Sequence, residues 1–145
     1  MSLRSFGIPG TLLALAVSVA SSCGEDACAC TPAETLVGTY NATRLRFTPS
    51  GKATVDALAA GATITLTLSG SGATSGTFFV PASLNDGVPL TLDLTGTYQS
   101  TTGHVTLSHS ADTFLRDVGW TWNGNTLTTN GSAGGVQYDV VLTRQ

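Results

Sequence analysis

Apolar and polar residues alternate in short runs from Leu36 onward, and no helical stripe longer than two turns appears. The clearest run is 62–69, in which Ile64, Leu66 and Leu68 alternate with threonines. A period of two places the apolar residues on one face of a strand and the threonines on the other. The pattern therefore predicts an all-β domain over residues 36–145, with about eight short strands.

Short turn sequences separate these runs. Asn123-Gly124 is typical of a two-residue hairpin, and Gly- or Pro-containing turns fall at 48–52, 70–72, 100–103 and 130–135. Tight turns make neighbouring strands antiparallel, and a meander of about eight strands closes on itself and loses its edges. We therefore expect a small antiparallel up-and-down β-barrel rather than a sandwich, which needs longer crossing connections.

The first strand, predicted over Leu36–Phe47, changes parity midway. Tyr40 belongs to one alternating set, whereas Leu45 and Phe47 belong to the other. A β-bulge near Thr43 restores a single inward face, and bulges of this kind suit barrel rims. We expect that bulge in the structure.

Three further segments complete the predicted meander. The alternation over 90–98 indicates one continuous strand, and that over 136–144 indicates a last strand that closes back onto the first. Residues 110–117 break the alternation and form either a short helical turn or a corner. A weak repeat, Leu-x-Gly-Thr-Tyr at 36–40 and at 94–98, reflects either duplication or convergent strand chemistry.

The N-terminal segment carries the marks of an export signal. Arg4 precedes the apolar run 11–20, which is too short to span a bilayer stably. Ala20-Ser21-Ser22-Cys23 follows and resembles the lipobox of bacterial lipoproteins, although Leu or Val is commoner at its first position. The resemblance implies a signal peptide over 1–22, acylation of Cys23, and export to the cell envelope with a membrane anchor, expected in the outer membrane. The alternatives are secretion after cleavage at Ala20 or Ser22, and a retained membrane helix.

Residues 23–35 are small, acidic and without periodicity, which predicts a flexible tether between the anchor and the domain. The chain's three cysteines all lie between Cys23 and Cys30, outside the predicted barrel, so no disulfide framework holds the domain. Cys28 and Cys30 are either incidental thiols or a strained ring. Metal ligation would need partners that the sequence does not supply.

Charge and candidate chemistry exclude more than they suggest. Charged residues make up 10% of the chain, six of them basic, and the net charge is −3, so we expect no nucleic-acid partner.

His104 and His109 point to opposite faces of one strand, and no nucleophile motif is present, so we expect neither an enzyme nor a metal or cofactor site. His109 with Asp112 is either a weak site or, more simply, a surface histidine beside a turn-capping aspartate. Asp112, Arg116 and Asp117 either bind a ligand at a barrel mouth or, more simply, form a local ion pair.

The predicted barrel resembles the lipocalin-like domains of the calycin group. Gly38-Thr39-Tyr40 stands where those barrels open with a Gly-x-Trp strand, about eight strands follow in meander order, and Arg144 ends the last strand. The resemblance implies that Arg144 packs across Tyr40 and closes one end of the barrel. That pair is structural, and a cation–π contact of this kind contributes about 0.5–2 kcal/mol.

Two functions remain open for a monomeric, anchored barrel. The first is binding of a small apolar, lipid-like ligand in a cavity of several hundred Å³. The alternative is a filled-core structural or protein-interaction domain with no small-molecule ligand. Leu, Ile, Val, Phe and Trp suit a dry pocket and a full core equally. The residues that we expect to line a cavity are the inward aromatic ones: Tyr98, Trp120, Trp122 and Tyr138.

Overall fold

A computed structural model of the chain describes residues 36–145. The predicted signal peptide over 1–22, the acylation site Cys23 and the tether over 23–35, with Cys28 and Cys30, lie outside the described residues. Within the described part, no helix has the length and apolar character needed to cross a membrane. The domain itself is therefore described from Leu36 to Gln145.

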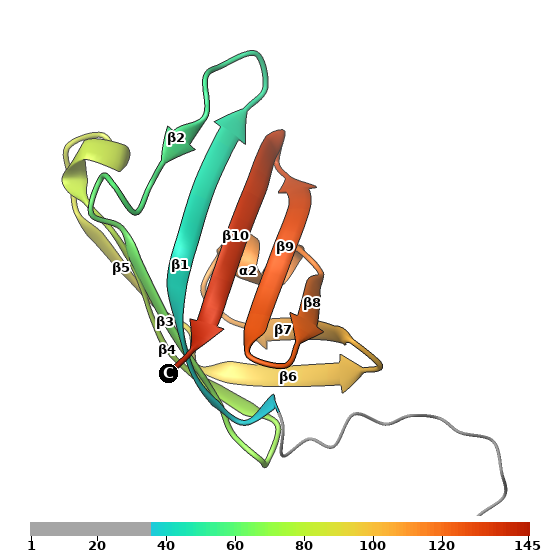
Figure 1. The fold of residues 1–145 in the computed structure, drawn as a ribbon. Coiled ribbons are helices and arrows are strands. Elements are labelled where there is room, and N and C mark those ends of the chain that lie inside the picture. The colour runs from blue at the N-terminus through green and yellow to red at the C-terminus, as the bar shows by residue number, and fades with distance from the viewer. Residues whose placement is uncertain (1–35) are drawn as a thin grey trace, which may run out of the picture.

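Eight antiparallel strands form a closed ring in which each strand pairs with its neighbours in chain order, and the last pairs with the first (Figure 1). The predicted all-β, up-and-down barrel is confirmed. The strands of the ring are β1 (Gly38–Pro49), β3 (Thr63–Leu68), β4 (Ala73–Val80), β6 (Gly96–Thr101), β7 (His104–His109), β8 (Trp120–Asn123), β9 (Thr126–Ala133) and β10 (Val136–Arg144).

Four short elements lie off the ring. β2 (Val55–Asp56) pairs with the far end of β1, and β5 (Leu90–Asp93) pairs with β4. The 3-10 turn η1 (Ala82–Leu84) precedes β5, and the helix α2 (Phe114–Asp117) lies between β7 and β8. Figure 1 shows α2 behind β9 and β10, on the inner side of the barrel wall.

The predicted bulge in β1 is confirmed. The pairing of β1 with β10 shifts between Ala42 and Arg44, so Thr43 is the extra residue. Tyr40 before the shift and Leu45 after it are both completely buried. The bulge thus lets a strand with two parities keep one inward face.

The prediction of one continuous strand over 90–98 was wrong. The chain leaves the extended conformation at Leu94 and Thr95, so β5 follows the upper half of β4, and β6 crosses to pair with β7. The Asp93 carboxylate accepts hydrogen bonds from the Thr95 amide (2.8 Å) and hydroxyl (2.6 Å), which holds the bend. Strand alternation survives such a corner, so the sequence pattern did not reveal it.

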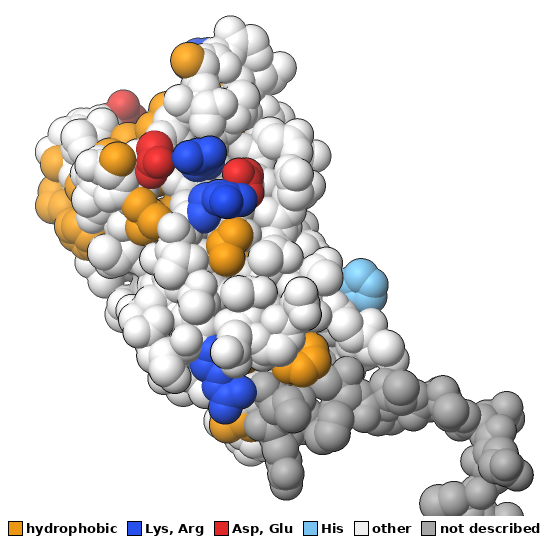
Figure 2. Space-filling view, in the orientation of Figure 1, with side chains coloured by type: hydrophobic (Ala, Val, Ile, Leu, Met, Phe, Trp, Pro, Cys, Tyr) orange, Lys and Arg blue, Asp and Glu red, His pale blue; other side chains and the backbone are white. Residues whose placement is uncertain are grey.

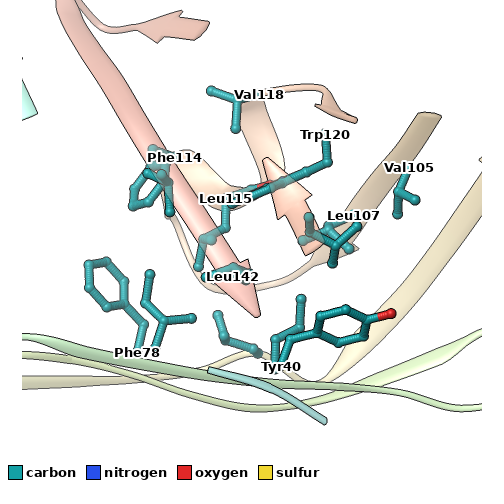
Figure 3. Packing of buried hydrophobic residues seen from close by; sticks show 14 of the residues in the cluster. Tyr40, Phe78, Val105, Leu107, Phe114, Leu115, Val118, Trp120 and Leu142 are labelled. Atoms are coloured by element: carbon teal, nitrogen blue, oxygen red, sulfur yellow. The ribbon is translucent and has the colours of Figure 1, made fainter. Parts of the chain in front are cut away.

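The inward side chains form one packed core. Figure 3 shows Phe78 and Tyr40 rising from the strands on one side, while Phe114, Leu115 and Trp120 approach from the other side. The twelve largest fully buried side chains all have exposures below 2%. They are Leu36, Tyr40, Leu45, Ile64, Leu66, Leu68, Leu94, Val105, Leu115, Trp120, Leu127 and Leu142.

Candidate functional site: the two ends of the barrel

The base of the barrel is closed where the first and last strands meet. Tyr40 on β1 lies directly opposite Arg144 on β10. A Cβ added to Gly38 would lie 2.7 Å from the Arg144 Nε, so the arginine side chain covers that glycine. The Tyr40 hydroxyl donates a hydrogen bond to the Leu36 carbonyl at 2.9 Å. Leu36 is itself buried, so this hydrogen bond joins Tyr40 to another residue of the core.

Burial raises the pKa of Tyr40 above its ordinary value, against the smaller opposing effects of the Trp122 indole and the Arg144 charge. The phenol is therefore protonated at neutral pH and acts as a hydrogen-bond donor. The register places Tyr40 and Arg144 together, as the family resemblance implies. Their role as a structural pair stays a prediction.

The second copy of the Leu-x-Gly-Thr-Tyr repeat occupies an equivalent position in its own strand. Gly38 and Gly96 are the first residues of β1 and β6. Tyr98 is buried like Tyr40, and its hydroxyl donates a hydrogen bond to the Ser69 carbonyl at 2.8 Å. Each copy thus anchors a buried tyrosine to a backbone carbonyl near the same end of the barrel.

The opposite end, the mouth, is closed by aromatic rings. Phe114 of α2 stacks on Tyr138 of β10, with ring centroids 4.3 Å apart and planes at 8°. Phe47 and Phe78 meet the Phe114 ring edge-on, at 5.6 and 5.8 Å. Phe47 also contacts Tyr138 edge-on at 5.4 Å. The sequence analysis did not single out Phe114, although the apolar pair Phe114-Leu115 inside a polar break was the available signal.

Two polar contacts attach α2 to the barrel. The Trp120 indole donates a hydrogen bond to the Leu115 carbonyl at 3.0 Å. His109 Nε2 lies 2.7 Å from the Thr113 hydroxyl, which is the residue before α2 and makes no capping bond to the helix. The interpretation of His109 as a surface residue beside Asp112 was therefore wrong, because His109 belongs to the inward set of β7 together with Val105 and Leu107.

His109 is 7% exposed, and its Nδ1 is buried without a hydrogen-bond partner among the described residues. Burial lowers the pKa of His109, the Arg116 charge lowers it further, and Asp117 opposes both. Arg116 itself is held by Asp112 at 2.7 Å and by Asp117 at 2.9 Å. The predicted local ion pairing of these three residues is confirmed.

The four aromatic residues proposed to line a cavity do not form one wall. Tyr98 and Trp122 lie close enough to Tyr40 to influence its pKa, whereas Tyr138 belongs to the mouth. Six residues of strand separate Tyr138 from Arg144, a span of about 20 Å. Trp120 is only 1% exposed and Tyr98 7%, so neither side chain borders an open cavity inside the barrel. Whether any of the four contacts a ligand stays a prediction.

The outer surface is mostly uncharged and rich in hydroxyl groups. One row of cross-strand partners runs Thr126, Thr143, Asn41, Thr65 and Thr77 across five strands. A shallow groove of about 270 Å³ lies along the β6–β7 hairpin, lined by Thr97, Tyr98, Gln99, Thr106, Leu107 and Ser108.

Charge gathers mainly over the upper part of β1 and β10, where Figure 2 shows acidic and basic side chains alternating. Arg44 lies 3.5 Å from Asp139, and Arg46 lies 3.7 Å from Asp56. These four groups are about half exposed, so their pairing contributes little to stability. Within residues 36–145, no three or more acidic, His or Cys side chains are placed to hold a metal ion.

Comparisons of the chain with protein-family models, with curated proteins and with solved structures find no match. The lipocalin-like character therefore remains a resemblance carried by Gly38, Tyr40, Arg144 and the closed ring of strands. The function has to be argued from the barrel itself.

Proposed function

We propose that this chain is a lipid-anchored envelope protein whose barrel is filled and which acts through its outer surface, as a structural or protein-interaction domain. The observation that carries the proposal is the burial of the interior: Tyr40, Trp120 and Leu142 are each at most 1% exposed. Space large enough for a ligand would leave accessible area on the side chains around it. The anchor and the export signal rest on the sequence around Cys23.

The outer hydroxyl row described above is the surface that this proposal assigns to a partner. Hydroxyls on and beside this row are tied to each other: those of Thr39 and Thr67 lie 2.9 Å apart, and that of Thr43 lies 2.8 Å from the hydroxyl of Thr143, which belongs to the row. An uncharged surface with ordered hydroxyls offers directional hydrogen bonds without electrostatic steering. A partner would therefore bind by shape and hydrogen bonding, with weak dependence on salt.

The second candidate function is binding of a small apolar ligand inside the barrel. It is favoured by the aromatic cluster at the mouth, where Phe47, Phe78 and Tyr138 surround a ring that comes from α2 and not from the barrel wall. An apolar ligand needs such a lining. In the structure described, the chain's own Phe114 takes that place.

Native mass spectrometry of the membrane-extracted protein at neutral pH separates the two candidates. The filled barrel predicts that the native mass equals the denatured mass. A reproducible excess in the native spectrum would show a resident small molecule and would overturn the proposal in favour of the second candidate.

The anchor is tested separately with Cys23→Ala. The substitution removes the thiol to which the lipoprotein resemblance assigns the anchor, so the protein should move from the membrane fraction to the soluble fraction. Cys28→Ala serves as the matched control and should leave the protein in the membrane fraction. Retention of the Cys23→Ala protein in the membrane would contradict lipid anchoring.

A further inference from the structure

We propose that the segment 110–118 is a displaceable plug, and that the place of the Phe114 ring is an apolar binding site opened by protonation of His109. This inference rests on the second candidate function and adds its location, its ligand class and its control. It requires that the segment fill the mouth of the barrel at neutral pH and leave it at acidic pH.

Segment 110–118, the plug, is not part of the ring of strands that forms the barrel wall. β6 and β7 pair over six residue pairs, from Gly96↔His109 to Thr101↔His104, whereas β7 and β8 pair only at His104↔Thr121 and Val105↔Trp120. The chain that fills the remaining gap contributes no strand. Its departure would break the hydrogen bond from Trp120 and the contact with His109, but none of the pairings that close the ring.

Packing and two polar contacts hold the plug against the barrel. Phe114 and Leu115 are buried, while both ion pairs of Arg116 are made within the segment, to Asp112 and Asp117. These ion pairs travel with the segment and do not tie it to the barrel. Attachment therefore depends on aromatic packing, the Trp120 bond and the buried contact between His109 and Thr113.

The surroundings of His109 disfavour protonation of its imidazole. A protonated imidazole would carry a second N–H at Nδ1, which is buried and faces no acceptor among the described residues. The charged groups that act on it are Arg116 and Asp117 of α2. Burial, and to a smaller extent Asp117, also raises the pKa of Tyr138 across the mouth. On β6, the residue opposite His109 is Gly96, which offers no side chain.

The direction of the pH effect follows from linkage. The docked segment holds the pKa of His109 below its ordinary value, whereas a released segment lets the imidazole reach water. The released state then binds more protons, so docking is strongest above the ordinary pKa of about 6.5 and weakens as the pH falls below it. One proton shifts the docking equilibrium by at most about tenfold per pH unit.

The lining of the vacated site defines the ligand class. Phe47 and Phe78 offer ring edges, and Tyr138 offers a ring face that Phe114 now covers. No charged side chain belongs to the four-ring cluster, so a charged ligand would be left without a partner there. The fitting ligand is an uncharged aromatic molecule or one with a short branched aliphatic chain.

The test is a titration of the full-length protein with N-phenyl-1-naphthylamine, an uncharged dye that fluoresces in apolar sites, at pH 7.5 and pH 5.0. The wild-type protein should bind the dye about tenfold more tightly at pH 5.0. Far-ultraviolet circular dichroism should show the β-sheet signal unchanged at both values. Absence of tighter binding in acid, or loss of the sheet together with dye binding, would overturn the proposal.

Three variants keep the test specific. His109→Gln cannot take up the proton, so its dye affinity should not change with pH. His104→Gln, at the other histidine of the chain and exposed on the same strand, is the matched control and should keep the wild-type response. Phe114→Ala should bind the dye at pH 7.5 without acid. A pH response that persists in His109→Gln, or an unchanged affinity of Phe114→Ala at pH 7.5, would place the effect elsewhere and refute the site.

The outcomes also separate this inference from the surface function. If the dye experiments fail, the proposal of a displaceable plug is refuted, and the proposal of a filled barrel is unaffected. If the native mass spectrum at neutral pH shows a bound small molecule, the proposal of a filled barrel is refuted, whatever the dye shows.

Discussion

The two ends of this barrel are closed by different means. At the base, neighbouring strands bring Tyr40, Arg144 and Gly38 together, and the closing groups belong to the ring of strands itself. At the mouth, closure depends on Phe114, which reaches the ring cluster from a short helix outside the strand ladder. The base can open only if the barrel unfolds, whereas the mouth can open by local movement. A barrel with this asymmetry is stable as a whole and adaptable at one end.

The largest expected effect comes from adding one carbon at Gly96, where the backbones of the paired strands β6 and β7 approach closely. A Cβ on Gly96 would collide with the backbone carbonyl of Ser108, and backbone on neither strand can move without breaking the pairing. Gly96→Ala should cost about 3 kcal/mol or more, or prevent folding. Gly119→Ala, where nothing lies within 4 Å, should be nearly neutral. Urea denaturation measures both, and a similar cost at the two glycines would contradict the close crossing.

Truncating one side chain at each end of the barrel compares how much the two ends contribute to the free energy of unfolding. Leu142→Ala leaves a cavity within the ring and should cost about 2–5 kcal/mol. Phe114→Ala removes a larger side chain but should cost less, because its loss is limited by the free energy needed to release the plug. Urea denaturation of both variants gives the two costs. A greater loss of stability for Phe114→Ala would mean that α2 is an integral part of the core.

A smaller effect is expected where the base is sealed. Arg144→Ala removes the side chain that covers Gly38 and faces Tyr40, so it should lower the melting temperature by several degrees, since about 1 kcal/mol corresponds to roughly 4–8 °C in a domain of this size. Arg44→Ala, on the exposed outer face, is the control and should shift it little. Dye affinity should not change in Arg144→Ala. An altered affinity with an unaltered melting temperature would assign Arg144 to a binding site.

The strand path at the base was predictable from periodic patterns in the sequence, whereas the pairing of Tyr40 with Arg144 was implied by the family resemblance. The parity change around Thr43 required a bulge, and the apolar residues of the first and last strands required that the strands meet with those residues inward. The register then follows from burial of one face. The closed ring was predicted for the same reason.

The mouth was only partly predictable, because Phe47 and Tyr138 lie in alternating strands whereas Phe114 lies outside any periodic run. Phe114 meets Phe47 and Tyr138 through contacts far apart in sequence, and nothing in the alternation specifies that meeting. His109 was taken for a surface residue because it stands near an aspartate of a turn, although the alternation of β7 places it inward with Val105 and Leu107. The bend at Thr95 was not predicted, because a side-chain hydrogen bond to Asp93 holds it while the alternation of apolar and polar residues continues through it.

The most direct test of the account is native-state hydrogen exchange at neutral pH. The Val118 amide, bonded to the Phe114 carbonyl, reports the plug, and the Leu94 amide, bonded to the Gly76 carbonyl, reports the barrel wall. The account predicts that Val118 exchanges through a local opening, with a free energy well below that of global unfolding and insensitive to low urea, while Leu94 exchanges only on global unfolding. Equal free energies of opening for the two amides would show one cooperative unit and contradict the distinction between a fixed base and a movable mouth.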